Sequence, residues 1–251
     1  MKKQGKILFL TLSLSFFFCI PFSSFCASKI TSSQIIQENI FLAQSGDYTV
    51  LSKGSQRAFI LIKSTSPKVV WLEIIHFPCI IYKERALIEK VSWKTAVHEL
   101  KSPSKVFVVS LSSDGTHLFS LNTRTQNLEP IVSSNEVPFF SQIFKLRLSP
   151  APLHLIKVEG KGNKSWFPKV SFEGAPPIPV PADAWHGFWP KDGGSLSETS
   201  ILMYFATPNI SPFPLWANIE TPKGNTIIRA LDVGHGATSP YLYSIPDCKI
   251  D

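Results

Sequence analysis

The chain has 251 residues, of which 44% are hydrophobic and 12% aromatic, and its formal net charge is +7. This apolar content excludes an intrinsically disordered chain, and the length is typical of one domain or two. The lysines and arginines are scattered without a run of five, so the charge pattern indicates no nucleic-acid partner. Twenty prolines disfavour long helices and are typical of turns, edge strands and extended segments.

The first segment predicts a secretory signal peptide over residues 1–28. Three lysines within the first six residues precede an uncharged apolar run at residues 7–20, and small and polar residues follow it. The run is shorter than the about 20 residues that a membrane-spanning helix needs, although an uncleaved anchor is the alternative. We therefore expect export across the inner membrane, with residues 29–251 forming a single β-rich domain in the periplasm or outer envelope, or secreted.

The cysteines allow two modifications of an exported chain. Cys26 follows the signal-like run and could carry a lipid at the mature N-terminus, so membrane association is expected only if Cys26 is lipidated or the signal is uncleaved. Cys79 and Cys248 could form a disulfide in an oxidising compartment, and the alternative is two unrelated thiols.

Alternating apolar residues and turn signals predict a meander followed by a helix. Strands rich in β-branched and aromatic residues are expected at 48–51, 58–62 and 69–75, and their short links favour antiparallel neighbours. Apolar residues then recur at spacings of three and four over residues 83–100, with charged residues between them. This pattern predicts an amphipathic helix that packs on the sheet and ends before Pro103.

The rest of the chain is predicted to be mostly strands. A short second helix is expected at 135–148, and strands at 106–111, 117–121, 153–159, 169–172, 201–205, 215–220, 226–233 and 241–243. The proline-rich stretch 174–181 is expected to be extended, either dividing two lobes near 174–182 or covering the sheet. The order predicts an α+β fold that is mainly β: a curved antiparallel sheet of about ten strands, half-barrel or sandwich-like, with one or two packed helices.

Two Asp-x-x-His pairs are the candidates for metal binding or catalysis. Asp183 and His186 form one pair, and Asp232 and His235 form the other. Two imidazoles and two carboxylates could bind zinc, or could supply a general base with its orienting acid. The sequence lacks a His-Glu-x-x-His or Cys-x-x-Cys motif, and the glycines on both sides of His235 are typical of a turn. No metal or other cofactor is therefore predicted.

Aromatic residues in the C-terminal half are the candidates for ligand binding. Trp185, Phe188, Trp189 and Trp216 could line a hydrophobic groove for a lipid, an acyl chain or the side chains of a partner protein. The alternative is that these residues form the core.

Several short motifs resemble an uncharacterised family of exported envelope proteins of intracellular bacteria. Residues 186–196 contain Trp-Pro-Lys-Asp-Gly, and residues 213–216 read Phe-Pro-Leu-Trp, which fit a Trp-Pro-x-Asp-Gly and Phe-Pro-x-Trp pattern. Residues 46–48, which read Gly-Asp-Tyr, fit the same resemblance, which implies no activity. The strand order is also similar to lipoprotein-carrier half-barrels, in which a curved antiparallel sheet holds acyl chains under helices; this second likeness concerns the fold alone.

Together these features favour a non-enzymatic periplasmic or envelope protein that binds an apolar ligand or another envelope protein. One alternative is a hydrolase or metal-dependent enzyme that uses Asp183, His186, Asp232 and His235. A structural envelope lipoprotein, held through Cys26, is the other.

Overall fold

The computed structural model describes residues 32–101, 105–113, 115–131, 142–159, 164–191 and 196–245. Within these ranges the elements are α1 (Ile35–Phe41), β1 (Tyr48–Lys53), β2 (Gln56–Thr65), β3 (Val69–Phe77), α2 (Tyr82–Ala96), β4 (Lys105–Ser112), β5 (Gly115–Asn122), β6 (Asn127–Pro130), η2 (Ile143–Lys145), β7 (Leu148–Pro150), η3 (Leu153–Leu155), β8 (Val158–Glu159), β9 (Lys164–Ser165), β10 (Lys169–Phe172), β11 (Ile178–Pro179), β12 (Asp183–Phe188), β13 (Ser200–Phe205), β14 (Trp216–Thr221) and β15 (Gly224–Gly234).

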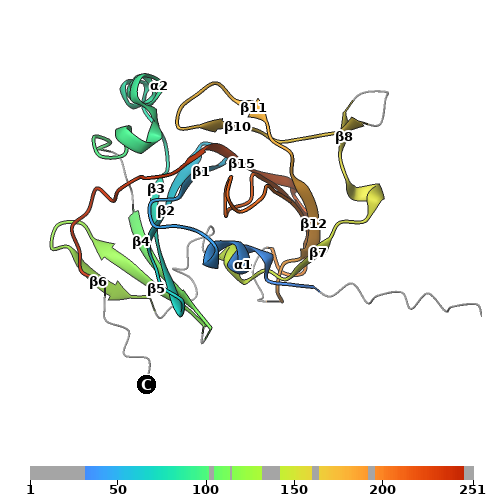
Figure 1. Ribbon diagram of the computed structural model, residues 1–251, viewed down its shortest axis with the longest axis horizontal. Helices are drawn as coiled ribbons and strands as arrows, with labels where there is room; N and C mark the ends of the chain where they lie inside the picture. The colour runs from blue at the N-terminus through green and yellow to red at the C-terminus, as the bar shows by residue number, and fades with distance from the viewer. Residues whose placement is uncertain are drawn as a thin grey trace, which may run out of the picture.

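Most of the strands belong to one sheet of 13 strands, whose main path runs β6-β5-β4-β3-β2-β1-β15-β14-β13-β12-β7. All pairings along this path are antiparallel, and β10 adds a short parallel pairing with β15. The path is not closed, and Figure 1 shows it curving from β15 round to β12 and β7. The predicted fold class, mainly β with a curved antiparallel sheet and packed helices, is confirmed. The described chain has more strands than the about ten expected, because several of them are only two to four residues long.

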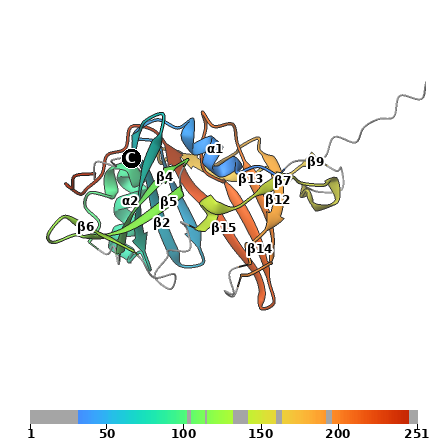
Figure 2. The ribbon, with the colours of Figure 1, turned by 90° about the horizontal axis from the view of Figure 1, so that it is seen from below.

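The meeting of β1 with β15 joins the two halves of the sheet. β1 to β6 form a meander of sequential neighbours, and β12 to β15 include a second run of antiparallel neighbours. β1 pairs with β15, and Figure 2 shows the hairpin that contains β2 and the hairpin of β14 and β15 with their turns at the same end of the strands. Strands on both sides of the proline-rich stretch 174–181 therefore share one sheet, and that stretch contributes β11, which pairs with β10.

The central strands are covered on both faces. In β1 and β2 alternate residues belong to two cores: Leu51 and Ile60 lie in the inner core, whereas Val50 and Phe59 lie in the outer core. This separation follows from the two-residue period of a strand. The short helix α1 adds Ile36 to the inner core and lies on the concave side of the curved sheet (Figure 1).

The helix predicted at 83–100 is present as α2 but is interrupted. Ser92 has φ 67, which is outside the helical region, and a side chain on neighbouring Gly174 would meet the Ser92 Cβ at 2.6 Å. The part after the interruption carries the deeply buried apolar residues, because Trp93 and Val97 are buried in the outer core whereas Val91 is only partly buried. None of the helices in the described ranges is long and apolar enough to cross a membrane.

Three predicted elements are wrong where they can be compared. The described end of the helix predicted at 135–148 is a single 3-10 turn followed by β7, and residues 132–141 lie outside the described chain. The strand expected at 153–159 begins instead as the 3-10 turn η3, directly after Pro152. The strand expected at 241–243 is irregular, because Ser239 Oγ accepts the Tyr241 N–H at 3.0 Å and closes a local turn. β12 was not predicted.

Candidate functional site

The start of β1 and the end of β15 meet in a polar cluster. Tyr48 is paired with Gly234, and the Ala237 N–H donates to the Gly46 carbonyl at 2.9 Å. The backbones approach so closely that a Cβ at Gly46 would lie 3.0 Å from the Gly236 Cα, and Gly46 has a left-handed φ of 94. Side chains from segments almost 190 residues apart are therefore brought into contact. We call Asp47, Tyr48, Glu173, Asp232 and His235 the Asp–His cluster.

Asp47 is the partner of His235. The two side chains are 2.7 Å apart, from Asp47 Oδ1 to His235 Nδ1, and the Gln44 N–H donates to the other carboxylate oxygen at 2.8 Å. The Asp47 side chain is only 7% exposed, whereas the His235 side chain is 57% exposed. Because an ionised carboxylate only accepts hydrogen bonds, Asp47 holds the tautomer in which Nδ1 carries the proton.

Asp232 has different partners. Its carboxylate accepts the Tyr48 hydroxyl and the Gly174 N–H, both at 3.0 Å, and it is 1% exposed. Burial raises the pKa of Asp232, although these two hydrogen bonds oppose the shift. Burial and the adjacent Asp232 charge likewise raise the pKa of Tyr48. Asp232 therefore ties β15 to β1 and to the loop after β10, and it does not orient His235.

Glu173 connects the cluster to α2. It has a left-handed φ of 50, and its backbone N–H donates to the Val233 carbonyl at 3.0 Å. Its carboxylate accepts the backbone N–H of His235 at 3.1 Å and lies 3.6 Å from Lys94 Nζ. The backbone and the ring of His235 are consequently held by two different carboxylates.

A hollow of about 580 Å³ lies beside the His235 ring. Its lining combines apolar and amide side chains with the Asp–His pair: Leu42, Gln44, Asp47, Pro208, Asn209 and His235. Within the described chain, Nε2 of His235 has no hydrogen-bond partner, because the single ring contact is made by Nδ1. We call this hollow the histidine hollow.

The second Asp-x-x-His pair lies elsewhere. Asp183 and His186 are in β12, three strands from β15, which corresponds to about 14 Å at the usual strand spacing. His186 Nε2 lies 3.2 Å from Ser200 Oγ, and Asp183 is exposed. The two pairs therefore do not form one site. In the described part of the chain, no group of three or more His, Cys, Asp or Glu side chains is placed to hold a metal ion.

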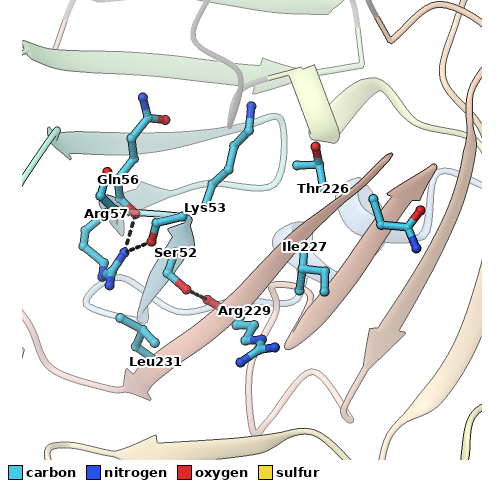
Figure 3. A pocket seen from close by; sticks show the side chains of 11 residues that line it. Ser52, Lys53, Gln56, Arg57, Thr226, Ile227, Arg229 and Leu231 are labelled. Atoms are coloured by element: carbon cyan, nitrogen blue, oxygen red, sulfur yellow. Dashed lines mark hydrogen bonds between the residues drawn. The ribbon is translucent and has the colours of Figure 1, made fainter. Parts of the chain in front are cut away.

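A larger hollow, of about 770 Å³, lies at the opposite end of β1 (Figure 3). It is lined by the β1–β2 turn and by β15, through Ser52, Lys53, Gly54, Ser55, Gln56, Arg57, Asn225, Thr226, Ile227, Arg229 and Leu231. Three of these residues are cationic and none is a carboxylic acid. We call it the cationic hollow.

Strand register places two of the cations on one face. Ser52 is paired with Arg57 on β2 and with Arg229 on β15, so the two arginines flank Ser52 in one row across three strands. Figure 3 shows Lys53 extending to the other side of the strands. Arg57 Nη1 donates to the Gly54 and Gln56 carbonyls at 2.6 and 2.8 Å, which fixes the guanidinium. Burial lowers the pKa of Lys53, and burial together with the nearby Arg85 charge lowers the pKa of Arg57.

Comparison with known proteins places the chain in a family. The family described as CT021 protein matches residues 58–176. The solved structure of the hypothetical protein CT021 from Chlamydia trachomatis shares 38% sequence identity with this chain, with a TM-score of 0.68. The match covers 84% of this chain and 97% of that one. This chain belongs to the CT021 protein family. No curated protein matches it in sequence.

Membership of the CT021 protein family agrees with the expected resemblance to an uncharacterised family of intracellular bacteria. The relative is described as a hypothetical protein, so the function of this chain has to be argued from its own side chains. Sequence reasoning found Asp232 and His235 but missed Asp47 as the histidine's partner, and it missed all three cations of the cationic hollow. Only the register of β1 with β2 and β15 brings these residues together.

The four aromatic residues predicted to bind a ligand lie in different surroundings. Trp189 and Trp216 are buried, at 2% and 4% exposed, and Trp189 belongs to the inner core. Trp185 is partly buried and packs against that core, whereas Phe188 is 60% exposed. The structure therefore does not bring these four side chains together in one groove.

Trp216 belongs to an aromatic cluster on the outer face of the sheet. Its ring is 5.7 Å from the Tyr204 ring and 5.4 Å from the Trp166 ring, both edge-on. Lys157 Nζ lies 3.9 Å from the centroid of Trp216, and the Tyr204 hydroxyl accepts the Lys157 N–H at 2.8 Å. The ring of Trp216 is therefore occupied by aromatic packing and a cation–π contact within the protein.

The predicted cysteine modifications fall largely outside the described residues. Cys79 is exposed just after β3, while Cys248, Cys26 and the predicted signal peptide lie outside the described chain.

Proposed function

We propose that this chain is an exported binding protein of the cell envelope, and that its ligand carries an anionic group and an apolar part. Export is supported by the positive and apolar N-terminal segment of the sequence. The binding site is the cationic hollow, whose volume of about 770 Å³ is within the range of ligand sites in proteins. No catalytic step is assigned to this hollow.

One observation carries the proposal: Arg57 and Arg229 flank Ser52 on one face of three adjacent strands, and the described residues that line this hollow include no carboxylate. Two guanidinium groups on one face attract an anion, and partial burial strengthens this attraction. Arg57 is already held by two backbone carbonyls, so little side-chain entropy is lost when it binds. Guanidinium groups suit phosphate or carboxylate oxygens in particular, because they present several N–H donors in a plane.

The apolar part of the ligand is argued from the rest of the lining. Ile227 and Leu231 lie on the same face of β15 as Arg229, because residues two apart on a strand share a face. Ile227 is 36% exposed, which is unusual for a large aliphatic side chain in this sheet. An amphiphile with an anionic head would therefore place its head near the arginines and its chain along these two residues. This narrows the sequence-based hypothesis of a lipid or acyl ligand.

Calorimetric titration of the purified chain tests the proposal. Dodecyl phosphate, kept below its micellar concentration, is compared with dodecyl maltoside, which lacks the charge, and with inorganic phosphate, which lacks the chain. We expect dodecyl phosphate to bind at least tenfold more tightly than either, and affinity to fall as salt is added. If dodecyl maltoside binds as tightly as dodecyl phosphate, the cations do not contribute to binding. If inorganic phosphate binds as tightly, the ligand's apolar chain does not contribute.

Two variants locate the site. Arg229→Gln and Arg57→Gln should each weaken dodecyl phosphate binding by about tenfold, the effect of losing one charge-assisted contact. Lys223→Gln is the matched control, because Lys223 is an exposed cation in the β14–β15 turn that does not line the hollow. The proposal fails if the control variant loses as much affinity as the two arginine variants.

A further inference from the structure

We propose that the histidine hollow is a second site, in which His235 acts as a general base and water hydrolyses a carboxylic ester. This goes beyond the binding function proposed for the cationic hollow and uses different residues. The two hollows lie at opposite ends of β1, which spans six residues, or about 20 Å.

The His235 ring is held in the orientation that a general base requires. Nδ1 donates to the buried Asp47 carboxylate at 2.7 Å, and Asp47 is itself fixed by the Gln44 N–H at 2.8 Å. Glu173 holds the backbone of His235 at 3.1 Å. A base oriented by an acid in this way is the arrangement that positions histidine in hydrolytic sites on unrelated folds. Asp47 is thus a positioning residue, and His235 is the group that contacts water.

The exposed half of the ring argues against a purely structural contact. A histidine that only ties two loops together needs its Nδ1 bond and gains nothing from an open Nε2. Here the side chain is 57% exposed and borders a hollow of about 580 Å³. Among the described residues Nε2 has no partner, so its lone pair is available to a water molecule in that hollow.

The lining of the hollow suits an ester substrate. Leu42 and Pro208 provide apolar surface, and Leu42 is 70% exposed. The amide groups of Gln44 and Asn209 are hydrogen-bond donors that can stabilise negative charge on a carbonyl oxygen. None of the described residues that line the hollow is a serine, threonine or cysteine, so we assign water as the nucleophile.

The reaction balances with water alone. Nε2 takes a proton from water while the water oxygen bonds to the ester carbonyl carbon, and the carbonyl electron pair moves to the oxygen. An amide N–H from Gln44 or Asn209 stabilises that oxyanion. When the electron pair returns, the bond to the leaving alkoxide breaks and the alkoxide takes the proton from Nε2. The products are a carboxylic acid and an alcohol, and His235 is regenerated.

Steady-state hydrolysis of p-nitrophenyl butyrate by the purified full chain tests the inference. We expect saturable turnover with a solvent deuterium isotope effect on kcat, and at least a hundredfold loss of kcat/KM in His235→Gln, the usual range for a general base. Asp47→Asn should lower kcat at least tenfold with little change in KM, since it disturbs the orientation of the base and not ester binding. A structural role alone would not separate kcat from KM in this way.

Exposed imidazoles hydrolyse nitrophenyl esters even where no binding site exists, so the assay needs a control for this background reaction. His154→Ala is that control, because His154 is an exposed histidine that does not line this hollow. It should keep the wild-type kcat/KM. Circular dichroism melts identify any variant that does not fold, and if Asp47→Asn unfolds, His235→Gln decides alone. Unsaturable hydrolysis in the wild type, or a His235→Gln variant as active as the wild type, would overturn the proposal.

Discussion

The two ends of the β1–β15 pair differ in how their charges are arranged. The same ladder runs from Tyr48 opposite Gly234 to Lys53 opposite Ile228. At the Asp–His end each acidic side chain has a specific partner: His235 for Asp47, Tyr48 for Asp232 and Lys94 for Glu173. At the other end, two arginines lie on one face, Lys53 extends to the other side, and the described lining of the cationic hollow includes no carboxylate.

This difference separates two uses of polar residues. Partnered groups at the Asp–His end fix geometry, and the Asp232–Tyr48 pair stabilises the fold most, because removing either member leaves a buried donor or acceptor unsatisfied. Arg57 and Arg229 lie on one face and repel one another, so they weaken the fold slightly and favour an anionic ligand. Substitutions at the first end should therefore reduce stability, and substitutions at the second end should reduce binding.

The largest effect is expected for Asp232→Ala. This change leaves the Tyr48 hydroxyl and the Gly174 N–H without their acceptor, and Tyr48 is 1% exposed. We expect the free energy of unfolding, measured by urea denaturation, to fall by about 3 kcal/mol. The exposed Asp183→Ala should stay within about 0.5 kcal/mol of the wild type. Equal losses of unfolding free energy in the two variants would show that the hydrogen bonds of Asp232 do not stabilise the fold.

The next largest effect is expected for Gly234→Ala. The added Cβ would lie 2.6 Å from Glu173 Cγ and 2.8 Å from Tyr48 Cε1, so the cluster would have to shift. Such overpacking should lower the free energy of unfolding by about 2 kcal/mol in the same assay. Ser55→Ala, in the exposed turn at the opposite end of β1, serves as the comparison and should be near neutral. If Gly234→Ala leaves the stability nearly unchanged, the side chains of Glu173 and Tyr48 can move aside at little cost, and the prediction is wrong.

A smaller effect is expected in the pH dependence of stability. Burial raises the pKa of Asp232 above its ordinary value of 3.8, so the folded state binds this proton more tightly than the unfolded state does. Stability from this group is therefore complete below the unfolded pKa and is lost as the pH rises through the folded pKa.

The matched variant for this effect is Asp232→Asn, which keeps one acceptor oxygen but cannot ionise. As the pH rises from about 4 toward neutrality, the wild type should lose stability relative to Asp232→Asn, measured by urea denaturation at each pH. Glu73, whose pKa is also raised by burial, is present in both proteins, so the difference isolates Asp232. Ser52→Ala should follow the wild type. A difference that grew in the opposite direction would contradict a raised pKa.

The smallest effect is expected for Arg229→Gln in the absence of ligand. Removing one cation from the cationic hollow relieves repulsion, so the variant should be as stable as the wild type or up to about 0.5 kcal/mol more stable at low salt. Thermal melts at low and high sodium chloride measure this, and the difference should vanish at high salt. A clear loss of stability would show that Arg229 has a structural role, as the residues of the Asp–His end do.

The sequence by itself determined the mainly β class and most of the sheet's strands, because those signals are local. Alternation along β1 to β3 and the glycines of the hairpin turns, such as Gly224 at φ 111, depend only on neighbouring residues. The interruption of α2 at Ser92 was not predicted from the sequence, and in the structure Gly174 from a distant loop lies against Ser92.

Both candidate sites were decided by the tertiary structure. Pairing of β1 with β15 joins residues more than 170 positions apart, and no local pattern specifies which strands pair across such a distance. Because of that pairing, the ring of His235 contacts Asp47 and not Asp232, which is nearer in sequence. The Asp232 carboxylate accepts hydrogen bonds from Tyr48 and Gly174 instead. The pairing also aligns Arg57 and Arg229 on the two sides of Ser52. Residue types were readable from the chain, whereas their partners were set by strand register.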